Sequence, residues 1–448
     1  MSNKTGLKQF VAKPARLPTQ NDQTIIRRIH SRCFNTIGNS ILTISVVVLG
    51  WYVISAALDW AVFNAVWHAS TRRECMNISS EGACWAGVIS WFNGLIYGRY
   101  PADQQWRINL GFILAVMWLF PLSCQKIAYR NFILLSWIGL YPFFGAYLFL
   151  GGTFGVDIGV FHGVLTCLAS GFFILLYANW LLAILNKPHL CEMFQPLASR
   201  LFNRWSQPLC LVFVWLVLSL PAAAVLSQVQ LQPVAIERWG GLFLTLIIAT
   251  FAITMSIPIG VILALGRQST LPVVHWLSLL VIELVRAVPL ITVLFMAVTL
   301  LPIFLPSDME LNKLSQVLFA VCIFAGAYMA ENIRGGLQAI PRGQYEAAQA
   351  LGLGYWFTML LIVLPQALRL MIPNIMTSFI SILKDTTLVS IIGLFDIMLM
   401  ARNISNDKDW IGLHTEPIAM ISILFFVLCY SMSQYSLNLE KRLKVDRS

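Results

Sequence analysis

The chain has 448 residues, of which 58% are hydrophobic and only 11% are charged, and its formal net charge is +10. Soluble domains carry about 25% charged residues, so this composition excludes a water-soluble globular protein. Uncharged windows of roughly 20 residues, long enough to cross a hydrocarbon core of about 30 Å, recur along the whole chain. The sequence therefore predicts an all-α, polytopic integral membrane protein. We expect ten crossings, at 38–60, 108–125, 131–151, 160–186, 208–228, 240–266, 275–304, 312–333, 372–400 and 417–439.

Residues 1–37 form a basic tail ahead of the first crossing. Short segments rich in Lys and Arg stay in the cytoplasm, so we expect this tail inside, and ten crossings then place the C-terminal "EKRLKVDRS" inside as well. A basic tail can also bind nucleic acid, but orientation in the membrane accounts for these charges. We therefore expect no nucleic-acid partner. The basic residues of the tail are Lys4, Lys8, Lys13, Arg16, Arg27, Arg28 and Arg32.

Two of the nine cysteines differ from the rest in their expected location. Cys75 and Cys84 lie in the single long outer loop, 61–107, where a disulfide can form, although two free thiols remain equally open. Most other cysteines lie within apolar runs, where they act as small hydrophobic residues. No Cys-x₂-Cys spacing or cluster of His is present, so the sequence predicts no metal site.

The organisation of the chain changes near residue 230. Residues 38–230 hold five apolar segments with bland connections, whereas 231–448 has connections rich in Gly, Pro and charge. The second part opens on "ERWGGLFLTL", whose two glycines allow close approach to another backbone. We interpret 38–230 as a membrane extension and 231–448 as the functional module.

The functional module contains no enzyme motif that we can identify. It lacks the G-x-x-x-x-G-K-[ST] phosphate loop, the H-E-x-x-H zinc motif and the G-x-S-x-G nucleophile motif. We therefore predict a chain that is not an enzyme and binds no cofactor itself.

A polar, alanine-rich stretch interrupts the apolar runs of this module. Residues 341–365 read "PRGQYEAAQALGLGYWFTMLLIVLP". Its first half contains good helix formers, and Gly352 and Gly354 can end a helix through a left-handed cap. On this pattern alone, the stretch predicts a short helix outside the bilayer, and a plain interfacial connector is an equally good interpretation.

The spacing within this stretch resembles a known signature. Glu346, Ala347 and Ala348 are followed by Gly352 and then by Ile362, Leu364 and Pro365, as in the "EAA" motif of permease subunits of binding-protein-dependent ABC importers. The flanking segments "IELVRAVPLITVLFM", "ENIRGGLQAIPRGQYEAAQALGLG" and "LKDTTLVSIIGLFDI" resemble the amino-acid branch of that family. The long extension is similar to the larger permeases of general or polar L-amino-acid importers.

The resemblance implies a type I ABC importer core of five helices in 231–448, with 341–365 as the segment that couples to an ATPase. It implies an inner-membrane subunit of bacteria that is not catalytic and that moves L-amino acids into the cytoplasm. The implied partners are two copies of a cytoplasmic ATPase, which hold ATP and Mg²⁺, a homologous permease in a heterodimer, and an external amino-acid-binding protein. A transporter or channel that works alone on an ion gradient is the alternative.

Charges within apolar segments are candidates for the substrate path, because burial in a membrane is unfavourable for them. Neighbours three residues apart on a helix can instead neutralise each other, which gives these charges a purely structural role. Lys384 and Asp385 lie midway along the predicted crossing 372–400, where a broken helix would suit a zwitterionic substrate. The full set of candidates is Lys384, Asp385, Thr386, Glu283, Arg286, Glu331 and Arg334.

Overall fold

The computed structural model describes residues 33–120, 137, 141, 145–151, 231–306 and 311–445. These residues form helices joined by turns and isolated β-bridges, which confirms the all-α prediction. They fall into two compact units. The first contains residues up to His68 together with Arg73–Trp85, and the second contains Ala69–Arg72 and the chain from Ala86 onwards.

The first unit is dominated by one apolar helix. Helix α2 (Ile37–Leu58) begins after Thr36, whose hydroxyl accepts from the Asn39 backbone N–H at 3.2 Å. The helix continues as a π-helix, η1 (Asp59–Phe63), and the two form a 27-residue candidate span that confirms the crossing predicted at 38–60. No residue of α2 is buried against the described residues, and its apolar composition suits a membrane span.

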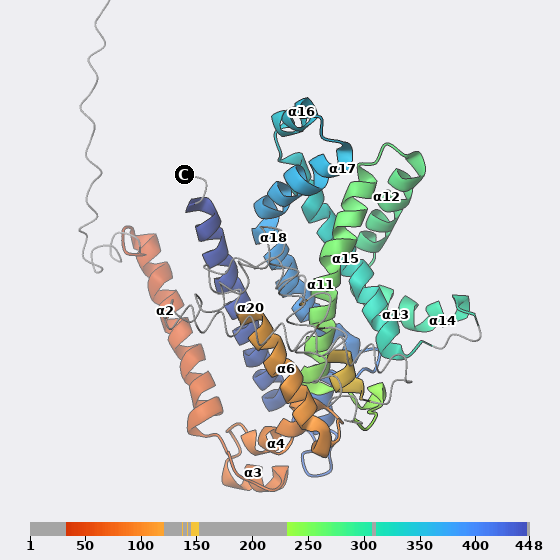
Figure 1. Cartoon of the computed structure of the whole chain (residues 1–448). Coiled ribbons are helices and arrows are strands. Elements are labelled where there is room, and N and C mark those ends of the chain that lie inside the picture. Colours follow the sequence, from red (N-terminus) through yellow and green to blue (C-terminus); the bar gives the residue numbers. More distant parts are fainter. Residues whose placement is uncertain are drawn as a thin grey trace, which may run out of the picture. The chain divides into compact units, whose positions relative to one another are not determined.

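The remaining helices follow in chain order and are labelled in Figure 1 where space allows. They are α3 (Arg72–Ile78), α4 (Trp85–Ser90), α5 (Phe92–Tyr97), η2 (Ala102–Gln104), α6 (Gln105–Leu119), η4 (Ile236–Arg238), α11 (Gly241–Arg267), α12 (Pro272–Ala287), α13 (Leu290–Thr299), α14 (Leu301–Phe304), α15 (Lys313–Gln338), α16 (Arg342–Ala350), α17 (Tyr355–Phe357), η5 (Thr358–Val363), α18 (Leu364–Asp385), η6 (Thr386–Ser390), α19 (Ile397–Ile404) and α20 (Thr415–Val445).

Three predicted crossings of the functional module are confirmed, within about five residues at each end. The crossings expected at 240–266, 312–333 and 417–439 correspond to candidate spans at Gly241–Arg267, Lys313–Gln338 and Thr415–Lys441. Helices α11 and α15 pack along each other, and α15 also packs against α18 (Figure 1). More than half of the apolar window of α15 is buried, so this helix lies at the centre of the module.

The crossing predicted at 275–304 is broken in the structure. Helix α12 ends at Ala287 and α13 begins at Leu290, and the two are bent by 109°. Val288 and Pro289 between them have extended backbones. The residue before a proline disfavours the helical region, and Pro289 has no N–H to continue the helix, so the segment is not one continuous helix, although α12 and α13 together are apolar and long enough for one broken span.

The crossing predicted at 372–400 is shifted along the chain. The candidate span runs from Tyr355 to Ser390, through α17, η5, α18 and η6. The apolar run "YWFTMLLIVLP", which we assigned to the coupling segment, is the first part of this span. Lys384 and Asp385 therefore lie near the end of the span, and the prediction that they lie midway was wrong.

The extension is described only in part. Helix α6 overlaps the start of the crossing predicted at 108–125, and residues 145–150 are helical within the crossing predicted at 131–151, but the described residues of these two segments are too few to test either crossing. The crossings predicted at 160–186 and 208–228, and most of the basic tail, lie outside the described residues. Arg107 of α6 is 1% exposed and donates to the carbonyl of Gln232 at 2.8 Å, which joins the extension to the start of the module.

The two glycines at the start of the module bring backbones together, as predicted. Gly98 forms a β-bridge with Trp239, and a Cβ on Gly98 would lie 2.3 Å from the Cα of Gly240. Gly241, with φ of 63°, donates its N–H to the carbonyl of Phe395 at 2.7 Å. Larger residues would prevent this contact between three segments of the chain.

Candidate functional site

Helix α16 carries the alanine-rich motif and lies between α15 and the span that begins at Tyr355 (Figure 1). It begins directly after Pro341, whose fixed φ suits the residue before a helix. It ends in a Schellman motif, in which Gly352 has φ of 75° and donates to the carbonyl of Gln349 at 2.9 Å. The N–H of Leu353 donates to the carbonyl of Ala348 at 3.1 Å. The predicted left-handed glycine cap is confirmed at Gly352.

The motif residues of α16 face in two directions. Ala348 is 1% exposed and lies on the side of α16 that packs against η5. Glu346 and Ala347 are exposed, and Leu351 is 77% exposed at the end of the helix. Within the described part of the chain, Glu346 forms no ion pair. The exposed side of α16 therefore combines the small side chain of Ala347 with the Glu346 carboxylate and with polar Arg342, Gln344 and Gln349, whereas Ala348 contacts the rest of the chain.

The second half of the motif lies in a different setting. Ile362, Leu364 and Pro365 are part of the span that begins at Tyr355, and Leu364 is 7% exposed. The helix widens into the π-helix η5 directly ahead of Leu364 and Pro365. In a regular α-helix the Pro365 ring would clash with the carbonyl four residues earlier, and a wider turn avoids this clash. These residues shape the start of the span beside α16 and do not belong to its exposed face.

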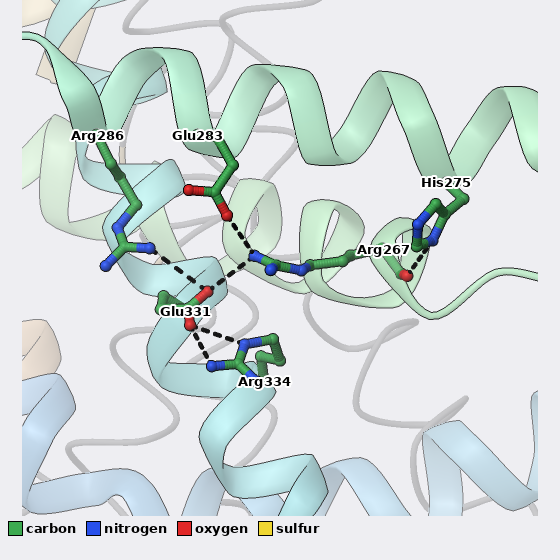
Figure 2. Close-up of polar contacts among 6 residues, drawn as sticks. All are labelled: Arg267, His275, Glu283, Arg286, Glu331 and Arg334. Atoms are coloured by element: carbon green, nitrogen blue, oxygen red, sulfur yellow. Dashed lines mark hydrogen bonds and ion pairs between the residues drawn. The ribbon is translucent and has the colours of Figure 1, made fainter.

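Five charged residues from α11, α12 and α15 meet beside the C-terminal end of α11. Figure 2 shows Glu331 of α15 between three arginines. One Glu331 oxygen accepts from Nε of Arg334 at 2.7 Å and also pairs with the second guanidinium nitrogen of that residue. The other accepts from Nη1 of Arg267 at 3.2 Å and lies 3.6 Å from Nη1 of Arg286. The same Arg267 nitrogen lies 3.1 Å from Glu283 (Figure 2).

This arrangement differs in part from the predicted neighbour pairs. Glu331 and Arg334 do pair within one helix, as their spacing predicted. Glu283 pairs with Arg267 and not with Arg286, while Arg286 reaches across to Glu331. The network thus joins α11, α12 and α15. Three arginines face two carboxylates, so the cluster keeps one net positive charge.

Arg267 was missed as a site residue, because the sequence showed it only as a basic residue at a helix end. Its position in the last turn of α11 is favourable for a cation. Its carbonyl oxygen also lies 2.6 Å from Nδ1 of His275 on α12, and this contact closes the connection between the two helices (Figure 2). No pattern in the sequence reveals contacts between residues 16 and 64 positions apart.

Lys384, Asp385 and Thr386, three of the candidates for the substrate path, lie together at the C-terminal end of α18, far along the chain from the alanine-rich motif of α16. Lys384 is exposed and Asp385 is half-buried, in the last turn of α18. The hydroxyl of Thr386 is buried and donates to the carbonyl of Leu383 at 2.7 Å. Within the described residues Lys384 and Asp385 form no ion pair with another helix. Their charges are therefore not neutralised by a packed partner.

Cys75 and Cys84 are joined by a disulfide in the structure, with their Cα atoms 5.9 Å apart. The bond links α3 to the segment just before α4, in the loop expected to lie outside. Among the described residues there is no group of three His, Cys, Asp or Glu that could hold a metal ion.

A buried carboxylate that the sequence did not reveal lies beside the start of the module. Asp396 is 0% exposed, and its Oδ1 accepts from the N–H of Leu399 at 2.9 Å as the N-cap of α19. Its Oδ2 is buried and has no hydrogen-bond partner among the residues that the structure describes. Burial raises the pKa of Asp396 to about 7, although the backbone N–H groups around it act in the opposite direction. This carboxylate lies outside the candidate spans, between Ser390 and Thr415.

Comparison with known proteins defines the class. Residues 256–445 match the family described as "binding-protein-dependent transport system inner membrane component". The inner membrane amino-acid ABC transporter permease protein YhdY of Escherichia coli is 34% identical over 441 residues, which cover 98% of this chain and 99% of that protein. The chain therefore belongs to this family of permease subunits and is a multi-pass membrane protein. The alternative of a transporter or channel that works alone is not supported.

Two further proteins are similar to the chain. The glutamate/glutamine/aspartate/asparagine transport system permease protein BztC of Rhodobacter capsulatus is 38% identical over 423 residues, which cover 91% of each protein. A crystal structure of an amino acid ABC transporter with histidines is 30% identical, with a TM-score of 0.41, and covers 45% of this chain and 92% of that one. The first similarity extends through the extension as well as the module.

Proposed function

We propose that the chain is the permease subunit of an ATP-driven importer of polar L-amino acids. The observation that carries the proposal is the exposed face of α16, which presents Glu346, Ala347 and Leu351 beside the membrane spans. The similarity to YhdY and BztC over more than nine tenths of each chain supports amino acids as the substrate class, and the name of BztC indicates polar ones.

Helix α16 is well placed to transmit movement from an ATPase. Only three residues, 339–341, separate it from α15, and four residues, 351–354, separate it from the span that contains α18. Because α15 packs against both α11 and α18, a push on α16 acts on the centre of the module. The small side chain of Ala347 allows close approach, and Glu346 can accept charge-assisted hydrogen bonds from a basic groove.

The charge cluster around Glu331 is the proposed lock at this end of the module. It holds α11, α12 and α15 together through contacts that are only partly buried, with Glu331 22% and Arg267 24% exposed. Ion pairs of this kind can exchange partners when helices shift, as in other proteins that change between two states. We therefore assign Glu283, Arg286, Glu331 and Arg334 to the lock, and keep Lys384, Asp385 and Thr386 as candidates for the substrate path.

The proposed assembly contains two copies of a cytoplasmic ATPase, which bind ATP and Mg²⁺, a homologous permease and an external amino-acid-binding protein. Coupling to a cytoplasmic ATPase requires α16 to lie inside, and the basic residues of the N-terminal tail and of "EKRLKVDRS" agree with both termini on that side. The protein would then reside in the bacterial cytoplasmic membrane, with Cys75 and Cys84 outside.

A matched pair of alanines tests the proposal. Ala347→Leu adds bulk to the exposed face, so the chain should fold normally but should lose the ATPase during purification and should not support ATP-dependent uptake in liposomes. Ala348→Leu adds the same bulk inside the chain and should lower stability by about 1–3 kcal/mol. Normal ATPase binding and uptake by a folded Ala347→Leu protein would contradict the role of α16. ATP-dependent uptake by this chain without any ATPase would contradict the proposed class.

A further inference from the structure

Three segments of the second unit meet at the start of α11. Gly98 of the extension forms a β-bridge with Trp239, and Gly241 forms another with Asp396, the residue before α19. The N–H of Gly241 donates to the carbonyl of Phe395 at 2.7 Å. Any separation of α19 from α11 must therefore break backbone contacts. We call this meeting point the α11–α19 junction, and it comprises residues 98, 239–241 and 395–397.

The side chain of Asp396 is enclosed by this junction. It is 0% exposed, and only its Oδ1 has a hydrogen-bond partner among the described residues, the N–H of Leu399. The hydroxyl of Thr245 beside it donates to the carbonyl of Gly241 at 3.1 Å and accepts from the N–H of Ile397 at 3.2 Å. A buried carboxylate oxygen without a donor is unfavourable, so the closed junction suits a neutral carboxyl better than a charged one.

Three cations lie near this part of the chain, but none pairs with Asp396 among the described residues. Arg402, on α19 itself, acts on the carboxyl only through its charge. The guanidinium of Arg99 lies over the ring of Phe395, 3.7 Å from its centroid, and Lys313 donates to a backbone carbonyl ahead of the junction at 3.3 Å. Burial outweighs the nearby backbone N–H groups and Arg402, and raises the pKa of Asp396 to about 7.

The elements that pack against α19 are α5, α11, η6 and α20, and they add few titratable groups. No charged residue occurs in α5 or η6, and the charged residue of α11, Arg267, is at its opposite end. Within the described part of the chain, Arg402 is the only charged side chain that shifts the pKa of Asp396, so neutralisation of this carboxyl depends on a bound proton. The other titratable groups nearest the junction, on α5, η4 and α20, are Tyr97, Glu237, Arg238 and Glu416.

The junction is close along the chain to the candidates for the substrate path. Only five residues, 391–395, separate Asp396 from η6, and η6 begins directly after Lys384 and Asp385. It packs against both α11 and α19. The span Tyr355–Ser390 begins beside α16, so the proposed cytoplasmic position of α16 places the junction at the outer face. Separation of α19 from α11 would thus move the outer end of the path.

We propose that Asp396 is a positioning residue for transport, whose neutral carboxyl keeps the junction closed and whose ionisation at alkaline external pH opens the junction and slows uptake. The inference rests on the proposed function for its orientation and for its first readout. In the closed junction the carboxyl is shielded from solvent, whereas in an open junction the carboxylate reaches water, which favours the charged form. The two arrangements therefore bind a proton with different affinities, and external pH shifts the balance between them.

Uptake into liposomes tests the proposal with the complete transporter, at an internal pH of about 7 and an external pH of about 6 or 8. Because Asp396 titrates near pH 7, its neutral fraction falls about tenfold between these two values. Glutamine uptake by the unaltered protein, divided by uptake by Asp396→Asn at the same pH, should fall by the same factor. The variant keeps the oxygen that accepts from Leu399 and cannot ionise. The division removes the pH response of the substrate, the binding protein and the ATPase.

Hydrogen exchange of the same assembly, without ATP or substrate, follows the junction itself. At each pH, the exchange rates of the Gly241 and Ile397 N–H groups in the unaltered protein are divided by those in Asp396→Asn. This ratio should rise about tenfold from pH 6 to pH 8, because ionisation is linked to opening. An assembly that imports nothing at any pH would overturn the proposed importer, and the exchange ratio alone would then decide the role of Asp396.

Two further variants separate the titration of the carboxyl from the stability of the junction. Asp396→Ser keeps an uncharged oxygen at the N-cap of α19 and replaces Asp396→Asn in both measurements if the latter folds poorly. Thr245→Val removes the contact with Ile397 and keeps the carboxyl. It should lower uptake at both pH values, and its uptake divided by that of Asp396→Asn should still fall about tenfold from pH 6 to pH 8.

Two outcomes would overturn the proposal. The first is a ratio of uptake or of exchange that stays the same at pH 6 and pH 8 when the unaltered protein is compared with folded Asp396→Asn and Asp396→Ser. The second is an uptake ratio that responds to internal and not to external pH, which would place the junction on the cytoplasmic side.

Discussion

The Glu331 carboxylate accepts a hydrogen bond from Arg267 at 3.2 Å, and this contact joins two helices across 64 positions of the sequence. The same carboxylate holds Arg334 on its own helix and faces Arg286 on a third. Glu331 is thus the only residue of the cluster drawn in Figure 2 that touches all three arginines. Among the described residues Glu283 pairs with Arg267 alone, and its side chain is 55% exposed.

This asymmetry predicts unequal effects of removing the two carboxylates. Glu331→Gln leaves three arginines close together with one remaining carboxylate, and should destabilise the purified protein by about 2 kcal/mol. Glu283→Gln removes one largely exposed ion pair, and its effect should stay below about 1 kcal/mol. Thermal unfolding of the two variants in the same detergent measures the difference. Equal shifts would contradict the central place of Glu331 in the lock.

The end of α16 offers a second matched pair. Neither Gly352 nor Gly354 has a heavy atom within 4 Å of the position of an added Cβ, but only Gly352 has a positive φ, of 75°. Gly352→Ala should therefore distort the Schellman cap, at about 1–2 kcal/mol, and should lower uptake and substrate-stimulated ATP hydrolysis together. Gly354→Ala should leave both activities unchanged. Gly352→Asn, which tolerates the left-handed region, should restore most of the loss.

If Gly352→Leu lost coupling to ATP hydrolysis and Gly352→Ala did not, the cause would be a steric clash with the ATPase and not strain in the left-handed backbone. Gly352→Leu is therefore measured beside Gly352→Ala, with ATPase binding as the common readout. If Gly352→Ala couples normally, the left-handed cap is not needed for transmission.

The sequence predicted those features that depend on neighbours along the chain. The cap at Gly352, the pairing of Glu331 with Arg334 and the close approach at Gly241 each follow from a few adjacent residues. The break at Pro289 was also visible in the sequence, but the continuous apolar run around it favoured one span. Apolar composition measures preference for lipid and carries little information about bends.

Features that depend on distant contacts were not predictable from one sequence. Arg267 and Glu331 meet only because α11 packs along α15. The burial of Asp396 arises because α19 packs against the start of α11, where the hydroxyl of Thr245 accepts from the N–H of Ile397 at 3.2 Å. The register error at 372–400 had a local cause, since an apolar run beside the motif was assigned to coupling and not to the membrane.

The last turn of α18 provides a test of the substrate path. Lys384 and Asp385 have no packed ion-pair partner in the described structure, so a zwitterionic substrate can use both charges. In the correctly assembled double variant Lys384→Met and Asp385→Asn, we expect uptake to fall at least tenfold, as for the loss of one or two charge-assisted hydrogen bonds. Basal ATP hydrolysis should persist because α16 is unchanged. Normal uptake rate and affinity would show that the two residues only fix the end of the helix.

The buried carboxylate of Asp396 predicts a pH dependence of stability. Its pKa is raised from 3.8 to about 7 by burial, so the folded state favours the protonated form more than the unfolded state does. The ionised form therefore destabilises the fold, by an amount that begins to grow near pH 4 and levels off above pH 7 at about 4 kcal/mol.

Asp396→Asn keeps the oxygen that accepts from Leu399 and removes the charge. The variant should thus gain stability over the unaltered protein by about 2–3 kcal/mol more at pH 8 than at pH 5. Asp409→Asn, at an exposed position beyond α19, is the control, and it should change stability by the same amount at pH 5 and at pH 8. Thermal unfolding of all three proteins between pH 5 and pH 8 gives the comparison, and parallel curves for Asp396→Asn and the unaltered protein would mean that Asp396 is ionised in the fold at both pH values.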